Sequence, residues 1–375
     1  MHIDTKCVHS GGYPDNQFKG INTPIFISSS HEYLDTEARL YQRYFNTPNQ
    51  EAVVKKLCAL EGAEDGIVFS SGMAAISTTL LAMLKSGDHA VVQDEIYGGS
   101  HSFAEEYFSR SGITFTLCGK DAGEIEEAVR PETRLIYIES PTNPLLGLVD
   151  LSAVAEIGRR KNIVTVIDNT FATPINQNPL RFGIDVVVHS GTKYLGGHSD
   201  LYCGAVLTRK DLAANIRKTA TGLGGSLNAM SCYLLERSLK TLALRVGRQT
   251  ENAFTLARFL QEHSNVAGVK YPGLENHPGH ATARSQMTGY GAMLSFETKD
   301  MTGQDFMKRL KLIKPALSLG GIESTVCDPA TTSHAKVSAE IKKRIGVSDN
   351  LLRLSVGIEN PGDLIEDIRQ ALENG

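Results

Sequence analysis

The sequence predicts an α/β protein with a large, mostly parallel sheet domain followed by a smaller C-terminal α/β domain. Between about residues 50 and 235, short β-branched runs alternate with helical stretches, as in a parallel sheet that is covered by helices on both faces. Long helical patterns then fill 228–262, and a shorter alternation resumes after residue 273. At 375 residues, the chain is long enough for more than one domain.

Each element follows from its local pattern. The first 45 residues are rich in Gly, Asn, Ser and Pro, so we expect an extended arm. In the larger domain, we expect strands at 66–69, 90–92, 113–117, 135–138, 164–167, 186–188 and 205–207, and helices at 50–61, 72–84, 101–110, 122–129 and 151–161. In the smaller domain, we expect strands at 292–296, 316–319 and 351–356 and a last helix at 362–373. The resulting division is an arm at 1–45, a large domain at 46–243 and a small domain at 244–375.

Composition excludes several classes of function. A formal net charge of −4 gives no indication of a nucleic-acid or anionic membrane partner. No apolar run approaches the roughly 20 residues of a membrane span, and the first residues have no apolar signal core. The six cysteines are scattered without a C-x-x-C pair, which argues against a disulfide framework or a zinc site. We therefore expect a cytoplasmic protein that acts on a small molecule.

The most informative segment follows the expected strand at 186–188. Its sequence His189-Ser190-Gly191-Thr192-Lys193 places an amine at the end of a buried strand, where a charge is expensive. A desolvated amine has a lowered pKa and forms Schiff bases with carbonyl groups. The hydroxyls of Ser190 and Thr192 suit a phosphate beside that amine. This pattern indicates a site for pyridoxal phosphate (PLP).

Four other segments place polar or aromatic groups at expected strand ends. Ser71-Gly72 opens a helix, which is a natural phosphate site and also an ordinary N-cap. Asp168 ends a strand, either as a turn residue or as the partner of a protonated pyridine nitrogen. Asn143 lies in a proline-bounded turn after Glu139, and Tyr97 precedes two glycines where its ring can stack on a flat cofactor. Each has a plain structural explanation, but their order along one sheet favours a shared site.

A metal-site alternative rests on His277 and His280. The two histidines flank Pro278-Gly279, and the sequence offers no third ligand. A solvent-facing turn explains them better than a zinc site. We therefore expect no metal.

Taken together, these segments resemble the Cys/Met-metabolism group of PLP enzymes, which includes cystathionine γ-synthase, the cystathionine γ- and β-lyases, methionine γ-lyase and O-acetylhomoserine sulfhydrylase. The resemblance covers nearly the whole chain. It is carried by Tyr41-Gln42-Arg43-Tyr44, Ser71-Gly72-Met73-Ala74-Ala75, Tyr97-Gly98-Gly99, Glu139-Ser140-Pro141-Thr142-Asn143-Pro144, Asp168-Asn169-Thr170-Phe171, Ser190-Gly191-Thr192-Lys193-Tyr194, Ser318-Leu319-Gly320-Gly321 and Leu352-Arg353-Leu354-Ser355. It implies fold type I of the PLP-dependent transferases and a homotetramer, a dimer of dimers with shared active sites.

The resemblance also assigns cofactor roles. Lys193 corresponds to the Schiff-base lysine and proton shuttle, Asp168 to the partner of the pyridine nitrogen, and Tyr97 to the stacking ring and a catalytic acid or base. Four residues correspond to the phosphate cradle: Gly72, Met73, Ser190 and Thr192. Tyr41 and Arg43 correspond to a pair that reaches the phosphate of the adjacent subunit.

On the substrate side, Arg353 and Asn143 correspond to the clamp on the α-carboxylate, and Ser318 to a residue that positions the substrate beside the lysine. The chain departs from the family where cystathionine enzymes often carry an arginine and a glutamate for the distal end of the substrate. Ser102 and Leu317 stand there instead, which makes the distal pocket less zwitterionic and favours a smaller or more apolar side chain.

We therefore expect a C–S lyase of the cystathionine-lyase type that converts cystathionine, or a related thioether or thiol amino acid, to a 2-oxo acid, ammonia and a thiol. The alternative is a transferase that performs γ-replacement, such as cystathionine γ-synthase or O-acetylhomoserine sulfhydrylase. A non-catalytic binding protein on the same scaffold is a more remote alternative, because Lys193, Asp168 and Arg353 are all present.

Overall fold

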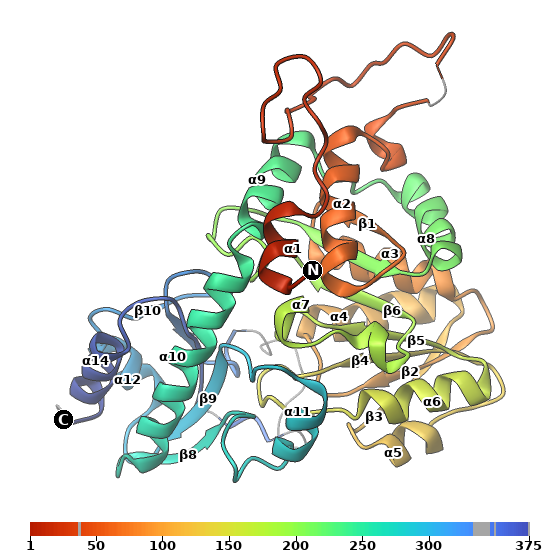
Figure 1. Ribbon diagram of the computed structural model, residues 1–375. Coiled ribbons are helices and arrows are strands. Elements are labelled where there is room, and N and C mark those ends of the chain that lie inside the picture. The colour runs from red at the N-terminus through yellow and green to blue at the C-terminus, as the bar shows by residue number, and fades with distance from the viewer. Residues whose placement is uncertain (37–38, 333–345, 349, 374–375) are drawn as a thin grey trace.

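The computed structural model describes residues 1–36, 39–332, 346–348 and 350–373. It contains two sheets that are joined by the long helix α10 (Leu242–Glu262) (Figure 1). The segment before α2 leaves the body of the molecule and returns to it (Figure 1). None of the helices in these ranges combines the length and apolar character needed to cross a membrane.

The large sheet has seven strands, and its order confirms the predicted class. The order is β1 (Asp65–Phe69), β7 (Gly204–Thr208), β6 (Val186–Ser190), β5 (Val164–Asp168), β4 (Thr133–Glu139), β2 (His89–Gln93) and β3 (Thr114–Cys118). The pairs from β6 to β3 are parallel, and β7 is antiparallel to both of its neighbours. The carboxyl ends of β4, β5 and β6 therefore meet at one edge of the sheet, which is where parallel sheets bind ligands.

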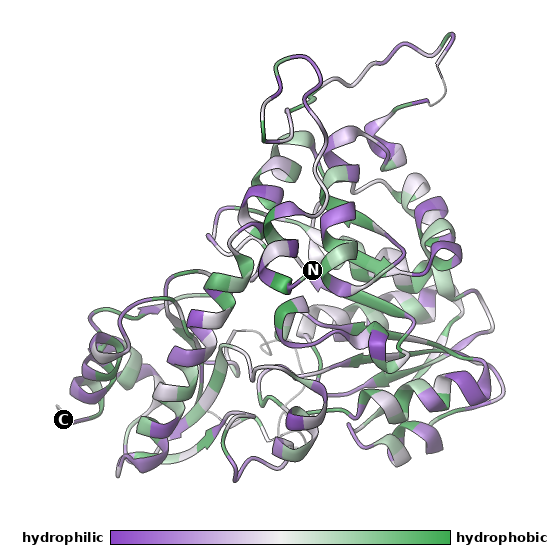
Figure 2. Ribbon diagram, in the orientation of Figure 1, coloured by the Kyte–Doolittle hydropathy of each residue, from purple (hydrophilic) through white to green (hydrophobic). Residues whose placement is uncertain are grey.

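Alternating residues of these strands enter two separate cores. Val187 packs with side chains of α2, α6 and α9, whereas Val186 and Val188 pack with those of α3 and α8. Both faces of the sheet are thus covered, and the strands are green in the hydropathy colouring (Figure 2). The helices of this part are α2 (Pro48–Glu61), α3 (Gly72–Met83), α4 (Gly98–Phe103), α5 (Ala122–Glu127), α6 (Leu151–Lys161), α7 (Thr173–Asn176), α8 (Lys210–Leu223) and α9 (Ala229–Leu239), with the short turns η1 (Gln42–Tyr44) and η4 (Pro179–Phe182).

The smaller sheet has five strands, with its own core against α10 and α14 (Pro361–Glu373). Its order is β10 (Lys314–Pro315), β11 (Thr325–Cys327), β12 (Leu351–Ser355), β9 (Met293–Thr298) and β8 (Val266–Lys270). Helices α11 (His280–Gln286) and α12 (Gly303–Arg309) complete the described part. Strand β12 carries Arg353 to the side that faces the large domain, where it contacts Asn143.

Four features differ from the sequence-based expectations. The arm begins with a helix, α1 (Ile3–His9), whose last turn is held because Lys56 Nζ donates to the carbonyl oxygens of Cys7 (2.9 Å) and Val8 (3.2 Å). The strand expected at 316–319 is wrong, since Ser318 has a left-handed φ of 79° that a strand does not accommodate. Strands β8, β10 and β11 were not expected. The helix expected at 101–110 ends in a π turn, η2 (Ala104–Phe108), and a 3-10 turn, η3 (Ser109–Ser111).

Candidate active site

The candidate site begins with two carboxyl groups at neighbouring strand ends. Glu139 ends β4 and Asp168 ends β5, and the two residues are paired in register. The Asp168 carboxylate accepts a hydrogen bond from the backbone N–H of Thr170 at 3.0 Å. Burial raises the pKa of Asp168, while the Thr170 hydrogen bonds and the charges of His189 and Lys193 oppose that rise. A buried carboxyl of this kind gains most from a cationic partner such as a protonated pyridine.

Lys193 lies in the tight turn after β6. Its backbone N–H donates to Ser190 O at 3.1 Å, and its carbonyl accepts from Gly197 N at 2.7 Å. The side chain Nζ donates to Ser318 Oγ at 2.7 Å, so a small-domain loop meets the lysine directly. Burial, helped by the charge of Arg353 and opposed by Asp168, lowers the pKa of Lys193 to about 8. The amine is therefore far closer to neutral at physiological pH than an exposed lysine, as a nucleophile requires.

The start of α3 lies against the end of β6. Ser71 caps this helix by accepting from Ala74 N at 3.1 Å. A Cβ added at Gly72 would lie 2.8 Å from the Cβ of Ser190, so only glycine permits this approach. Near the same point, a Cβ at Gly99 would meet both the Tyr97 ring, at 2.5 Å, and Met73 Sδ, at 3.1 Å. The structure thus brings Gly72 close to Ser190, and Met73 close to Tyr97, at a helix N-terminus that suits a phosphate.

The hydroxyl of Thr192, also expected at the phosphate, is bonded to the backbone of a neighbouring segment. It donates to Cys203 O at 3.2 Å and accepts from Cys203 N at 3.1 Å. These two bonds fasten the lysine turn to the segment before β7. The Thr192 hydroxyl therefore already has two backbone partners. Its role in phosphate binding stays a prediction.

The three residues expected to bind the substrate, Asn143, Ser318 and Arg353, lie together across the two domains. Arg353 is buried, at 4% exposure, and donates from one terminal nitrogen to Asn143 Oδ1 at 2.8 Å. Its other terminal nitrogen lies 3.4 Å from Ser318 O, and its buried Nε has no hydrogen-bond partner among the described residues. A buried guanidinium with an unused donor is suited to a planar carboxylate.

Tyr41 and Arg43 lie outside this cluster within the chain. The Arg43 guanidinium stacks 5.6 Å from the ring centroids of Tyr41 and Tyr44 and donates to Thr221 O at 2.8 Å. Their expected role at the site of a neighbouring subunit stays a prediction.

Glu139 is a site residue to which sequence reasoning gave no role. Its carboxyl accepts from the backbone N–H of Tyr97 at 2.8 Å, so it holds the loop that carries the aromatic ring. Burial and the nearby Asp168 raise the pKa of Glu139 well above its ordinary value. The signal in the sequence was a second acidic residue at a strand end.

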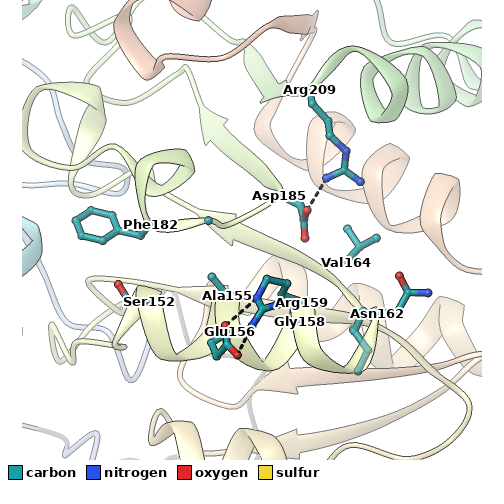
Figure 3. A pocket seen from close by; sticks show the side chains of 12 residues that line it. Ser152, Ala155, Glu156, Gly158, Arg159, Asn162, Val164, Phe182, Asp185 and Arg209 are labelled. Carbon is teal, nitrogen blue, oxygen red and sulfur yellow. Dashed lines mark hydrogen bonds and ion pairs between the residues drawn. The ribbon is translucent and has the colours of Figure 1, made fainter.

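Two other candidates do not form a competing site. His277 Nδ1 accepts from Gly279 N at 3.1 Å, His280 Nδ1 lies 2.8 Å from Pro272 O, and the described residues contain no group of three metal-ligating side chains. A surface cavity of about 380 Å³ lies at the opposite, amino-terminal edge of β5 and β6 (Figure 3). Its two arginines are already paired, Arg209 with Asp185 and Arg159 with Glu156 (Figure 3).

The residues at the strand ends fit PLP. The site offers an amine with a lowered pKa, a buried carboxylate, a helix N-terminus opened by glycine and an aromatic side chain at its border. A family model for Cys/Met metabolism PLP-dependent enzymes matches residues 4–373. The chain belongs to this family.

Relatives in the Cys/Met metabolism family match the chain over its length. It is 41% identical to cystathionine gamma-lyase of Bacillus subtilis, with 100% of each chain covered. It is 40% identical to cystathionine beta-lyase of Coxiella burnetii, over 99% of this chain and 98% of the relative. A solved cystathionine gamma synthase from Xanthomonas oryzae pv. oryzae, in complex with aminoacrylate and cysteine, superposes with a TM-score of 0.95 at 36% identity, over 99% of this chain and 98% of that one.

The lowered pKa of Lys193 gives a first prediction. We expect the rate at which the apoprotein binds PLP covalently to rise with pH and to level off above about 8, because only the neutral amine attacks an aldehyde. Stopped-flow absorbance after mixing with PLP measures this rate. An Arg353→Met variant should shift the midpoint to higher pH, since Arg353 helps to lower this pKa. A rate that keeps rising towards 10.5, the value of an ordinary lysine, would contradict the assignment.

Proposed function

We propose that this PLP-dependent enzyme is a C–S lyase that cleaves L-cystathionine, or a related thioether or thiol amino acid, to a 2-oxo acid, ammonia and a thiol. The observation that carries the proposal is the position of Ser318 between the lysine and the arginine. Its hydroxyl accepts from Lys193 Nζ, and its backbone carbonyl lies 3.4 Å from the Arg353 guanidinium. A carboxylate held by Arg353 would place the α-carbon of an amino acid near Lys193 Nζ. The names of the B. subtilis and C. burnetii relatives support a lyase.

The residues of the site have distinct tasks in this reaction. Bound PLP supplies an electron sink for the α-carbon. Lys193 Nζ takes the α-proton and returns it to the substrate or product, a transfer that a pKa near 8 favours. Asp168 would hold the proton on the ring nitrogen of the cofactor, Arg353 and Asn143 would fix the α-carboxylate, and Tyr97 would stack on the ring and be available as an acid or base.

A γ-replacement transferase is the second candidate, and the structural likeness to a cystathionine gamma synthase favours it. The uncharged residues expected at the distal end of the substrate support a lyase of broad specificity. Leu317 is 70% exposed beside Ser318, and Ser102 lies on α4 after Tyr97. Neither side chain carries a charge for the distal amino or carboxylate group of cystathionine.

One assay separates these candidates. The PLP-loaded protein is incubated with L-cystathionine, L-methionine, L-cysteine, or O-acetylhomoserine plus a thiol, and the products are identified by mass spectrometry. Pyruvate from cystathionine shows β-cleavage and 2-oxobutyrate shows γ-cleavage, and either supports the lyase. A new thioether without a keto acid supports the transferase. Bound PLP without turnover of any of these substrates would favour a non-catalytic binding protein.

We also propose that the protein is a cytoplasmic homotetramer, a dimer of dimers with shared active sites. The support is the segment before α2, which carries exposed apolar side chains with little contact to their own chain, among them Phe18, Ile21, Ile27 and Leu34. Such a stretch gains stability by packing on another subunit. We propose the same division as above: an arm at 1–45, a large domain at 46–243 and a small domain at 244–375.

Subunit complementation provides a second prediction. We expect Arg43→Ala to weaken PLP binding and activity, and we expect a refolded mixture of Arg43→Ala with Lys193→Ala to be more active than either variant alone. In a shared site, the hybrid joins Lys193 of one subunit to Arg43 of the other. Arg110→Ala is the matched control, because Arg110 stacks 5.7 Å from the Tyr107 ring in a similar cation–π contact. An active monomer, or no recovery in the mixture, would contradict sharing.

A further inference from the structure

A third buried carboxylate lies beneath the strand ends of the site. Glu61 is the last residue of α2 and has no exposed surface. Its Oε1 lies 2.6 Å from His189 Nε2 and accepts from Asn169 Nδ2 at 3.1 Å. Its Oε2 accepts from Asn178 Nδ2 at 3.4 Å. Asn169 directly follows Asp168, and His189 directly precedes Ser190, so one carboxylate is bonded to both strand ends that carry cofactor residues.

The position of Glu61 is unfavourable for stability alone. A carboxylate at the last turn of a helix opposes the helix dipole, and its burial adds a desolvation penalty. Two side-chain amides donate to it, which is the environment of an ionised carboxylate rather than of a neutral acid. The imidazole of His189, 1% exposed, is the group that can balance this charge as an imidazolium.

The imidazole also acts on Asp168. Strands β5 and β6 are adjacent, with Asp168 paired to Val188, and Asn169 N donates to Val188 O at 3.0 Å. The charge of His189 opposes the rise that burial causes in the pKa of Asp168. Gln177 holds the Asn169 side chain in place. The Gln177 side-chain amide donates to Asn169 Oδ1 at 2.9 Å, and Asn169 Nδ2 donates to the backbone carbonyl of Gln177 at 3.0 Å.

We propose that Glu61 and His189 form a buried ion pair that fixes the ends of β5 and β6 and keeps Asp168 ionised, so that Asp168 can hold the proton on the ring nitrogen of PLP. Both are positioning residues, because they act through Asp168. The inference depends on the cofactor of the family and not on which sulfur amino acid is the substrate. It is therefore tested by PLP binding and not by turnover.

The test compares Glu61→Gln, His189→Gln and Asp168→Asn, singly and in pairs, by PLP titration of the apoproteins and by the visible spectrum of the bound cofactor. We expect Glu61→Gln and His189→Gln each to weaken PLP binding by about tenfold, the equivalent of one unit of pKa. We also expect each to shift the spectrum towards that of Asp168→Asn. In the Asp168→Asn background, Glu61→Gln should then have almost no further effect, since coupled residues are not additive.

Glu51→Gln, at a partly exposed position of the same helix, is the matched control, because its one ion pair with a described residue is a surface contact with Lys55 at 3.7 Å. The double variant Glu61→Gln/His189→Gln separates charge from packing. Its uncharged amide pair should restore the melting temperature towards that of the wild type, while PLP binding stays weak. Recovery of PLP binding in this variant would overturn the proposal, as would a wild-type spectrum in Glu61→Gln or effects of Glu61→Gln and Asp168→Asn that simply multiply.

Discussion

Replacing Lys193 with alanine is expected to lower kcat by about 10⁴-fold, the upper range for loss of a positioned acid–base group. Lys193 has the lowered pKa of a nucleophile and sits in the turn after β6, with its Nζ 2.7 Å from Ser318 Oγ. Alanine at position 193 removes both the proposed covalent anchor for PLP and the group proposed to move the α-proton. Steady-state formation of 2-oxo acid measures the loss, and a thermal melt of each variant checks folding.

Two further measurements make this prediction specific. Borohydride reduction of the wild type should add one cofactor to the peptide that contains Lys193, and Lys193→Ala should show no such addition. A small primary amine in the buffer should restore part of the turnover, because it supplies the missing base. Lys55→Ala is the control, since Lys55 lies on the surface of α2 in a pair with Glu51. Labelling of another lysine, or turnover in Lys193→Ala within tenfold of the wild type, would show that another residue has this role.

Local signals predicted the larger part of the fold. The run Val186–Val188 is apolar on every residue and forms a central strand because both faces of the sheet are covered. Helix α6 has the predicted bounds, since its end signals lie within the sequence itself. Asp150 accepts from Ala153 N at 3.0 Å as the N-cap, and Asn162 adopts the left-handed φ of 54° at the C-cap.

The elements that were missed depend on distant residues. Helix α1 is held by Lys56, which lies about 50 positions further along the chain, so no pattern within residues 1–10 indicates it. The stretch 316–319 has the composition of a strand, but Ser318 is turned towards Lys193 and Arg353. Gly320 then packs on the lysine turn, where an added Cβ would lie 2.7 Å from Tyr194 N. Contacts of the site override β-propensity here.

The site likewise combines features set by local signals, which could be predicted, with features set by distant residues, which could not. Residue type and position at a strand end were enough to group Asp168 and Lys193 at one edge of the sheet. The pairing of His189 with Glu61 joins residues 128 positions apart, and neither residue stands in a motif for such a pair. The hydrogen bond from Thr192 to Cys203 could not be predicted from the sequence either, because it depends on the path of the chain before β7.

Replacing Arg353 with lysine is expected to lower kcat/KM for α-amino acid substrates by about 10²-fold, within the range for truncating a buried hydrogen-bonded charge. The guanidinium donates to Asn143 Oδ1 at 2.8 Å from one nitrogen, and its buried Nε has no partner in the part of the chain that the structure describes. A lysine keeps the charge but cannot offer two parallel N–H groups to a carboxylate. The loss should appear mainly in KM, while affinity for PLP changes little.

A ligand without the carboxylate tests whether Arg353 acts through that group. We expect L-cystathionine to bind more weakly to Arg353→Lys than to the wild type in a spectral titration, and a thioether amine that lacks the α-carboxylate to bind both proteins alike. Arg369→Lys is the control, because Arg369 is a partly exposed arginine that pairs with Glu366 at 2.7 Å on its own helix. Equal losses for both ligands would mean that Arg353 supports the shape of the site rather than the carboxylate. Arg353 also helps to lower the pKa of Lys193. Because Arg353→Lys keeps the positive charge, the pKa of Lys193 should be similar in the two proteins. The difference between the two ligands therefore reports on the carboxylate alone.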